Sequence, residues 1–142
     1  MLTLAIDTAT KVCTIALCRN KEILAEYTIN MGMTHSEGLL PQLDQLLQRT
    51  GVQKQDIELL AVSMGPGSFT GLRIGSATAK GLGLALNKPL IHIPTLDGTA
   101  YNLFGASGLI CPIMDARRNQ VYTGIYRFEK EFQVVMEQDA MD

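Results

Sequence analysis

The stretch SMGPGSFTGLRIG, residues 63–75, has the residue types of a phosphate-binding loop, since glycines and hydroxyl side chains precede a predicted helix. A Walker loop needs G-x-x-x-x-G-K-[ST], but no lysine follows here until Lys80. A dinucleotide fingerprint needs G-x-G-x-x-G, and Thr70 stands where its third glycine would be. Two interpretations remain. Either Ser68 and Thr70 help to hold an anion, or the stretch is a tight turn in which one of them caps the helix, and we favour the turn.

A second candidate, Asp7 with Thr8 and Thr10, follows the first predicted strand. A carboxylate beside hydroxyl groups fits the approach of phosphate and magnesium, so these three are candidate cofactor-binding residues. The alternative is a turn in which the carboxylate accepts backbone hydrogen bonds.

The sequence offers no spacing typical of a metal site or a catalytic triad. A metal-binding helix that began at His35 would carry a second histidine at position 39, which is Leu39, and the only other histidine is His92. The three cysteines lack C-x-x-C spacing, which argues against a zinc ribbon and a disulfide framework. We therefore expect no catalytic residue and no metal.

The elements that must position these residues are strands and helices in a mixed order. Predicted strands cover residues 2–7, 12–18, 22–29, 57–64, 89–93, 109–115, 120–128 and 132–138. Predicted helices cover residues 36–49, 71–86 and 95–104. Such an order is typical of a mixed α/β sheet with helices on its faces and matches the ribonuclease-H-like half-fold. The restart with hairpins near residue 109 indicates a second unit, as in two-lobed actin-like proteins.

The helix ends carry their own signals. Thr34 and Glu37 fit a capping box at the start of the first helix, and Thr95 is a plausible cap of the third. Pro41 removes an internal hydrogen bond, so we expect a kink or a later start in the first helix.

The second helix has two rows of very small residues beside one ridge of large ones. The rows, four residues apart, are Gly71, Gly75, Ala79, Gly83 and Ala77, Gly81, Ala85. An emptied row is a groove that a neighbouring element can enter closely. A glycine in an exposed helix costs about 1 kcal/mol relative to alanine, so close packing must offset that cost. Either the protein's own sheet fills both grooves, or one groove faces another helix or subunit; the position of Leu72 and Leu84 beside the charged strip of Arg73 and Lys80 favours the second arrangement.

The composition argues against direct binding of nucleic acid and against insertion into a membrane. The 142 residues carry a net charge of −2 and 6% aromatic residues with no tryptophan, which is a poor surface for nucleic acid. The N-terminus lacks a signal peptide, and no apolar run approaches bilayer length. We expect a cytoplasmic protein that serves RNA, if at all, through a partner.

Five stretches together resemble the TsaB (YeaZ) family of bacterial tRNA threonylcarbamoyladenosine biosynthesis proteins. They are AIDTAT, THSEGLLP, SMGPGSFTGLRIG, TLDGTA and MDARRNQVY, in this order from residue 5 to residue 122. The third is highly specific, whereas AIDTAT alone is common among actin-like proteins. The resemblance extends over essentially the whole chain.

The resemblance implies an actin-like ATPase (ASKHA) fold and the role of a non-catalytic partner of the related TsaD. TsaD, with TsaB and the small ATPase TsaE, transfers a threonylcarbamoyl group to the adenosine beside the anticodon of tRNA. TsaD carries paired histidines for its metal at the helix that here begins near His35, and Leu39 stands at the partner position. The alternatives are an actin-like ATPase or phosphotransferase that uses Asp7, and a glycoprotease-like metallopeptidase.

The resemblance also implies pairing through the first two helices, as a homodimer or with TsaD. The residues that we expect at this interface are Gly38, Leu39, Gln42, Leu46, Leu72, Gly75, Ser76, Ala79 and Gly83. Family members normally continue well past residue 142. We therefore expect a complete N-terminal lobe over residues 1–106, the start of a second lobe over 107–142, and no bound cofactor.

Overall fold

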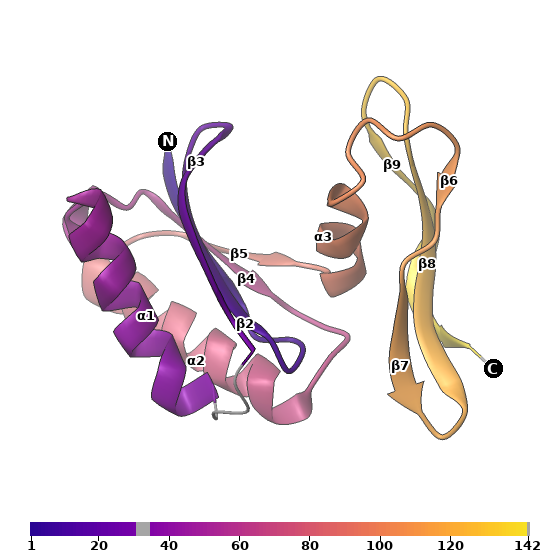
Figure 1. The fold of residues 1–142 in the computed structure, drawn as a ribbon, viewed down its shortest axis with the longest axis horizontal. Coiled ribbons are helices and arrows are strands. Elements are labelled where there is room, and N and C mark those ends of the chain that lie inside the picture. The colour runs from indigo at the N-terminus through magenta and orange to yellow at the C-terminus, as the bar shows by residue number, and fades with distance from the viewer. Residues whose placement is uncertain (31–34, 142) are drawn as a thin grey trace. The chain divides into compact units, whose positions relative to one another are not determined.

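The first five strands of the computed structural model, which describes residues 1–30 and 35–141, form one mixed sheet with the order β3-β2-β1-β4-β5 (Figure 1). β1, β2 and β3 are antiparallel neighbours, whereas β4 runs parallel to β1 and β5 runs parallel to β4. The strands are β1 (Leu2–Asp7), β2 (Cys13–Arg19), β3 (Glu22–Ile29), β4 (Leu59–Ser63) and β5 (Leu90–Ile93). This sheet confirms the mixed α/β sheet predicted for the first part of the chain, with its strands close to the predicted residues.

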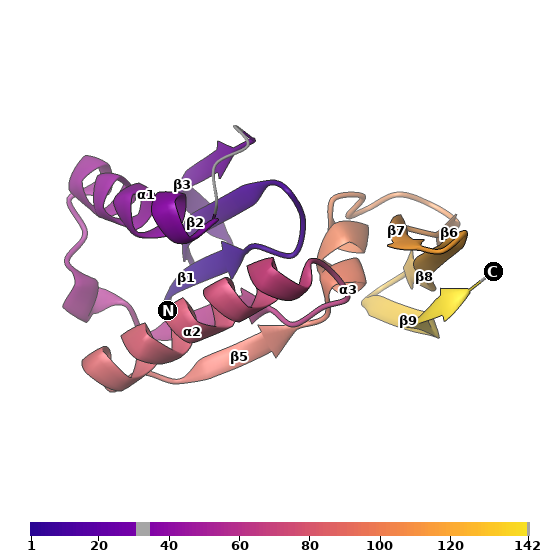
Figure 2. The ribbon, with the colours of Figure 1, turned by 90° about the horizontal axis from the view of Figure 1, so that it is seen from below.

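Two helices, α1 (His35–Thr50) and α2 (Phe69–Leu86), pack on one face of this sheet. In β1 the buried Leu2, Leu4 and Ile6 alternate with the less buried residues between them, as a strand with one covered face requires. These side chains form one core with Leu39, Leu43, Leu46 and Leu47 of α1 and with Ala79 of α2. α2 runs beside β5 (Figure 2), and a short 3₁₀ helix, η1 (Lys54–Asp56), precedes β4.

A second sheet is built around one central strand. β8 (Gln120–Phe128) pairs antiparallel with β6 (Leu109–Ile110), β7 (Ile113–Arg117) and β9 (Phe132–Met141). The helix α3 (Thr95–Tyr101) contributes Leu96 and Ala100 to a core with Ile110 and Tyr126. Tyr126 is completely buried and its ring stacks on Phe132, with centroids 5.5 Å apart.

The chain divides into two compact units, and the division differs from the boundary expected at residue 106. Unit 1 comprises residues 1–64 and 68–93, and unit 2 comprises residues 65–67 and 94–142. The difference arises because α3 packs on Tyr126 and thus belongs with the second sheet. The short turn Gly65–Gly67 also belongs to unit 2, although the sequence places it between β4 and α2.

Several element ends depart from the sequence predictions. Pro112 divides the run 109–115 into β6 and β7, since proline cannot donate a ladder hydrogen bond. The third helix ends at Tyr101 instead of 104, and β9 continues to Met141. Thr95 is the first residue of α3 and not its cap, because the cap is Pro94. α1 continues through Pro41, while the predicted partner of Glu37, Thr34, lies outside the described residues.

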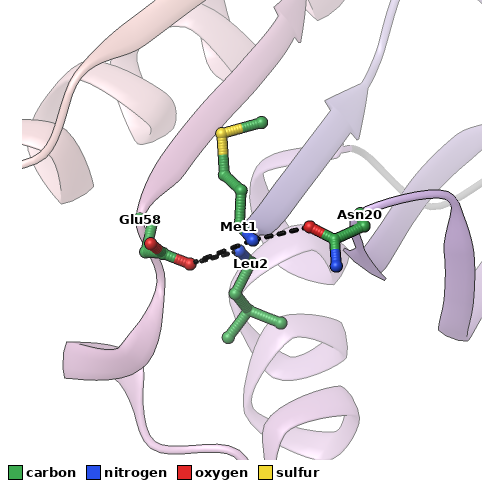
Figure 3. A network of polar contacts seen from close by, with 4 residues as sticks. All are labelled: Met1, Leu2, Asn20 and Glu58. Carbon is green, nitrogen blue, oxygen red and sulfur yellow. Dashed lines mark hydrogen bonds and ion pairs between the residues drawn. The ribbon is translucent and has the colours of Figure 1, made fainter.

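The first residue of the chain is held by a polar network at the edge of unit 1 (Figure 3). The α-ammonium group of Met1 donates to Asn20 Oδ1 at 2.7 Å and lies 3.6 Å from Glu58 Oε2. Glu58 Oε2 also accepts the backbone N–H of Leu2 at 2.6 Å. This backbone donor, together with the nearby ammonium charge, lowers the pKa of Glu58 below its usual value of 4.5. The carboxylate thus joins the entry to β4 with the start of β1.

We predict that Glu58→Gln lowers the urea midpoint of unfolding at pH 7. Because the pKa of Glu58 is lower in the folded state, its carboxylate stabilises the fold above the ordinary pKa of 4.5 and loses this effect as the pH falls through the lowered value. The difference between the two proteins should therefore vanish in strong acid. Glu22→Gln, an exposed carboxylate of β3, is the matched control. A difference that stays constant with pH would contradict the role of the charge.

Candidate functional site

The turn that leads into α2 uses its polar groups to hold the backbone. Ser68 caps the helix, since its Oγ accepts the N–H of Gly71 at 3.2 Å. Within unit 2, the N–H of Gly65 donates to Thr95 Oγ1 at 3.1 Å, and its carbonyl accepts from Thr95 N at 2.9 Å and from Gln138 Nε2 at 3.0 Å. Gly65 has a φ of 105°, a conformation that favours glycine. These contacts support the tight turn with a serine cap.

The first row of small residues on α2 is filled by the protein's own strand end. Thr8 is fully buried, and its hydroxyl donates to the carbonyl of Gly71 at 2.7 Å. A Cβ atom at Gly75 would overlap Thr8 Oγ1. Ala79 is completely buried in the core of unit 1. The glycines of this row thus allow the end of β1 to lie directly against α2.

The candidate cofactor residues take the turn alternative. Asp7 Oδ1 accepts the N–H of Ala9 at 2.8 Å, and Thr10 Oγ1 accepts the N–H of Val12 at 3.1 Å. The hydroxyl of Thr8 points into the protein and is used by Gly71. Thr8 is therefore not available to a bound phosphate, which corrects its assignment as a cofactor residue.

Five of the nine residues expected at a partner interface face the core of unit 1. Leu39 and Leu46 of α1 belong to the hydrophobic core, and Gln42 between them is only 3% exposed. On α2, Gly75 and Ala79 are buried against the sheet. Their side chains are covered by the protein itself, so the expectation that they contact a partner is wrong. The helical repeat places these residues on one face but does not say that this face is the inner one.

The other four residues of that prediction are partly accessible. Gly38, Leu72, Ser76 and Gly83 are half-buried. Gly83 lies close to the carbonyl of Lys88, which a Cβ would meet at 3.3 Å. Leu72 and Ser76 line a surface depression.

The second row of small residues on α2 is open. Ala77, Gly81 and Ala85 are all exposed, and a Cβ at Gly81 would have no atom within 4 Å. Leu84, beside this row, is 85% exposed, and Leu40 of α1 is 53% exposed. One groove is therefore filled by the sheet, and the other is free in the single chain.

A depression of about 630 Å³ lies on unit 1 between α2 and the ends of β4 and β5. Its lining residues are Ser63, Met64, Phe69, Leu72, Arg73, Ser76, Ala77, Lys80 and His92. The guanidinium carbon of Arg73 lies 3.8 Å from the centre of the Phe69 ring, a cation–π contact. We did not predict this depression. A signal for it was present in the sequence, because residues 59–96 contain basic side chains but no aspartate or glutamate.

The described part of the chain shows no cluster for a metal, and Cys13 is not placed as a nucleophile. No three histidine, cysteine, aspartate or glutamate residues gather among residues 1–30 and 35–141 in a way that could hold a metal. Cys13 is buried, and burial raises the pKa of its thiol, which favours a small hydrophobic role over a nucleophilic one. The described helices include none that is both long and apolar enough to cross a membrane.

Comparisons with known proteins agree on one family. A family profile described as "TsaD: tRNA N6-adenosine threonylcarbamoyltransferase" matches residues 22–142. The chain is 41% identical to the tRNA threonylcarbamoyladenosine biosynthesis protein TsaB of Bacillus subtilis, over 99% of this chain and 62% of the relative. It is 36% identical to TsaB of Escherichia coli, over 89% of this chain and 55% of that protein. The chain thus spans little more than half the length of these relatives.

A solved structure gives the same result for the fold. YeaZ from Pseudomonas aeruginosa superposes with a TM-score of 0.88 at 30% identity, over 99% of this chain and 67% of that one. Together with the sheet order, this likeness confirms the predicted α/β fold of the actin-like, ribonuclease-H-like class.

We predict opposite effects for alanine at two glycines of α2. Gly75→Ala should lower the free energy of unfolding by about 1–3 kcal/mol, because the new methyl group forces Thr8 and the helix apart. Gly81→Ala should raise it by about 0.5–1 kcal/mol, because that position is open and alanine favours the helix. Urea denaturation of both variants measures the two effects. A neutral Gly75→Ala would contradict the close approach of Thr8.

Proposed function

The chain belongs to the TsaB (YeaZ) family, and we propose that it acts in tRNA threonylcarbamoyladenosine biosynthesis as the non-catalytic partner of a TsaD-type subunit. In this proposal the chain is a scaffold, and it acts by pairing through α1 and α2. The modified base is the adenosine beside the anticodon. The observation that carries the proposal is the open row of small residues on α2, beside an almost fully exposed leucine.

The open row suits a second helix. Ala77, Gly81 and Ala85 repeat every four residues, so they form a groove about 12 Å long on one side of α2. Side chains of a partner helix pack into such a groove at a short distance between the helix axes. Burial of Leu84 and Leu40 at the same contact supplies the hydrophobic contribution, since both are more than half exposed in the single chain.

We propose that the chain itself is not catalytic, and the residues of α1 support this. The position four residues after His35 is Leu39, and Leu39 is 2% exposed in the core of unit 1. A metal-binding helix would present a second ligand there. The use of the Thr8 hydroxyl within the fold supports the same proposal, because an actin-like phosphotransferase would need that turn for its nucleotide.

The other partners follow from this role. We propose that the same α1–α2 surface forms a homodimer when the chain is alone, and that a TsaE-type ATPase joins the complex with TsaD. Contact with tRNA is indirect, since the chain has a net charge of −2 and few aromatic residues. In this proposal the chain and its partners act in the cytoplasm.

We predict that Gly81→Leu weakens binding to a TsaD-type subunit at least tenfold, because a large side chain fills the groove that the partner helix must enter. Size-exclusion chromatography of the mixed proteins and titration calorimetry measure the loss. The substitution should not lower the thermal midpoint, because a Cβ at Gly81 has no atom within 4 Å and leucine favours a helix more than glycine does. Gly81 is therefore a cleaner test than Gly75, where a large residue would damage the fold.

Lys130→Leu, which adds the same side chain at an exposed site of the β8–β9 connection, is the matched control. It should bind like the unaltered protein. If Gly81→Leu folds normally and still forms the complex with full affinity, α2 is not the pairing surface.

A further inference from the structure

The depression between α2 and β5 is lined by two large apolar side chains, Met64 and Phe69, that the proposed helix pairing does not use. Met64 is 55% exposed and Phe69 is 69% exposed, although both are large hydrophobic side chains. Phe69, Arg73 and Lys80 follow one another along α2 at spacings of four and seven, so they lie on one face of the helix. The open row of small residues lies on a neighbouring face, and Ala77 alone is common to both surfaces.

Two cationic side chains line this depression. They are Arg73 and Lys80 of α2, and His92 of β5 lies in the same lining. No ion pair with a carboxylate of the described residues is formed by Arg73 or Lys80. The segment from residue 59 to 96 contains no aspartate or glutamate that could provide one locally. The surface thus presents unneutralised positive charge beside exposed apolar side chains, which complements a ligand with acidic and apolar groups.

The outer edge of β5 adds backbone hydrogen-bonding groups to this surface. β5 is the last strand of its sheet and pairs only with β4 among the described strands. Its contacts with β4 use alternate residues, because Leu60 N donates to Pro89 O at 3.0 Å and Met64 N donates to Ile93 O at 2.9 Å. In a parallel pair the intervening residues direct their N–H and C=O groups to the other side. The backbones of Leu90 and His92 therefore face the free edge.

His92 joins the two features, since its side chain lines the depression and its backbone lies at the free edge. We propose that this part of unit 1 binds an extended acidic peptide segment of a partner protein. The peptide adds to β5 as a further strand, places an apolar side chain on Met64 and Phe69, and directs carboxylates to Arg73 and Lys80. Strand addition beside a helix supplies affinity through the backbone and specificity through the side-chain pocket. This binding site does not depend on the proposed pairing through the open row.

The test uses the full chain and a fluorescein-labelled peptide that repeats the order Val-Val-Glu-Glu. Because successive side chains of an extended peptide point to opposite faces, each face then carries both valine and glutamate. Fluorescence anisotropy should show binding that weakens as salt is added. Arg73→Ala and Lys80→Ala should each weaken it about two- to fivefold, whereas Lys130→Ala, which removes an exposed charge of unit 2, should have no effect. The same peptide with lysine in place of glutamate should not bind.

Two comparisons test whether the peptide pairs with the backbone of β5, separately from its side-chain contacts. His92→Pro removes the outward N–H in addition to the imidazole, so it should bind about two- to tenfold more weakly than His92→Ala. Because proline could disturb β5, a peptide with N-methyl groups at alternate positions tests the same step on the unaltered protein, and it should lose binding. Equal binding of the methylated peptide would overturn the strand addition. Tight binding of oligouridylate in place of the acidic peptide, or no binding of the peptide, would overturn the site itself.

Discussion

The close approach of β1 to α2 is the contact on which the rest of unit 1 depends. Thr8 lies against Gly75 and donates its hydroxyl hydrogen to the carbonyl of Gly71, so the helix carries no side chain where the strand ends. The contact sets which side of α2 faces the sheet. The outer surfaces of α2 follow from it: the open row of small residues and, on the neighbouring face, the depression with Arg73 and Lys80. A buried hydroxyl that donates to a helix carbonyl thus marks the face of α2 that lies against the sheet and leaves the other faces exposed.

The sequence predicted the elements well and the orientation of α2 only in part. Strands in which apolar and polar residues clearly alternate, such as 2–7 and 120–128, were found at the predicted residues, because polar turns mark where such strands end. The two small rows were recognised from helical spacing, but spacing relates residues to one another and not to the sheet. The choice between the rows depends on Thr8, which is 63 residues from Gly71 in the chain, and this is why Gly75 and Ala79 were assigned to the wrong side.

Long-range packing also explains the other differences. The third helix was assigned to the first lobe because the second unit was expected to start with the hairpins near residue 109, whereas Leu96 and Ala100 of this helix share a core with Tyr126. The depression on α2 was missed because its residues come from one helix and the ends of two strands, which only the folded sheet brings together. The absence of acidic residues over 59–96 was visible in the sequence, but its meaning depends on that geometry.

The place of residues 65–67 affects how this protein can be divided into fragments. The backbone leaves unit 1 after Met64, returns at Ser68 and leaves again after Ile93, so the two units share three covalent junctions. A fragment cut after Ile93 would retain Gly65 without Thr95 and Gln138, which hold both its N–H and its carbonyl. The start of α2 would then follow a turn whose hydrogen-bonding groups have lost their partners. The units are therefore distinct in packing but not separable as independent pieces of chain.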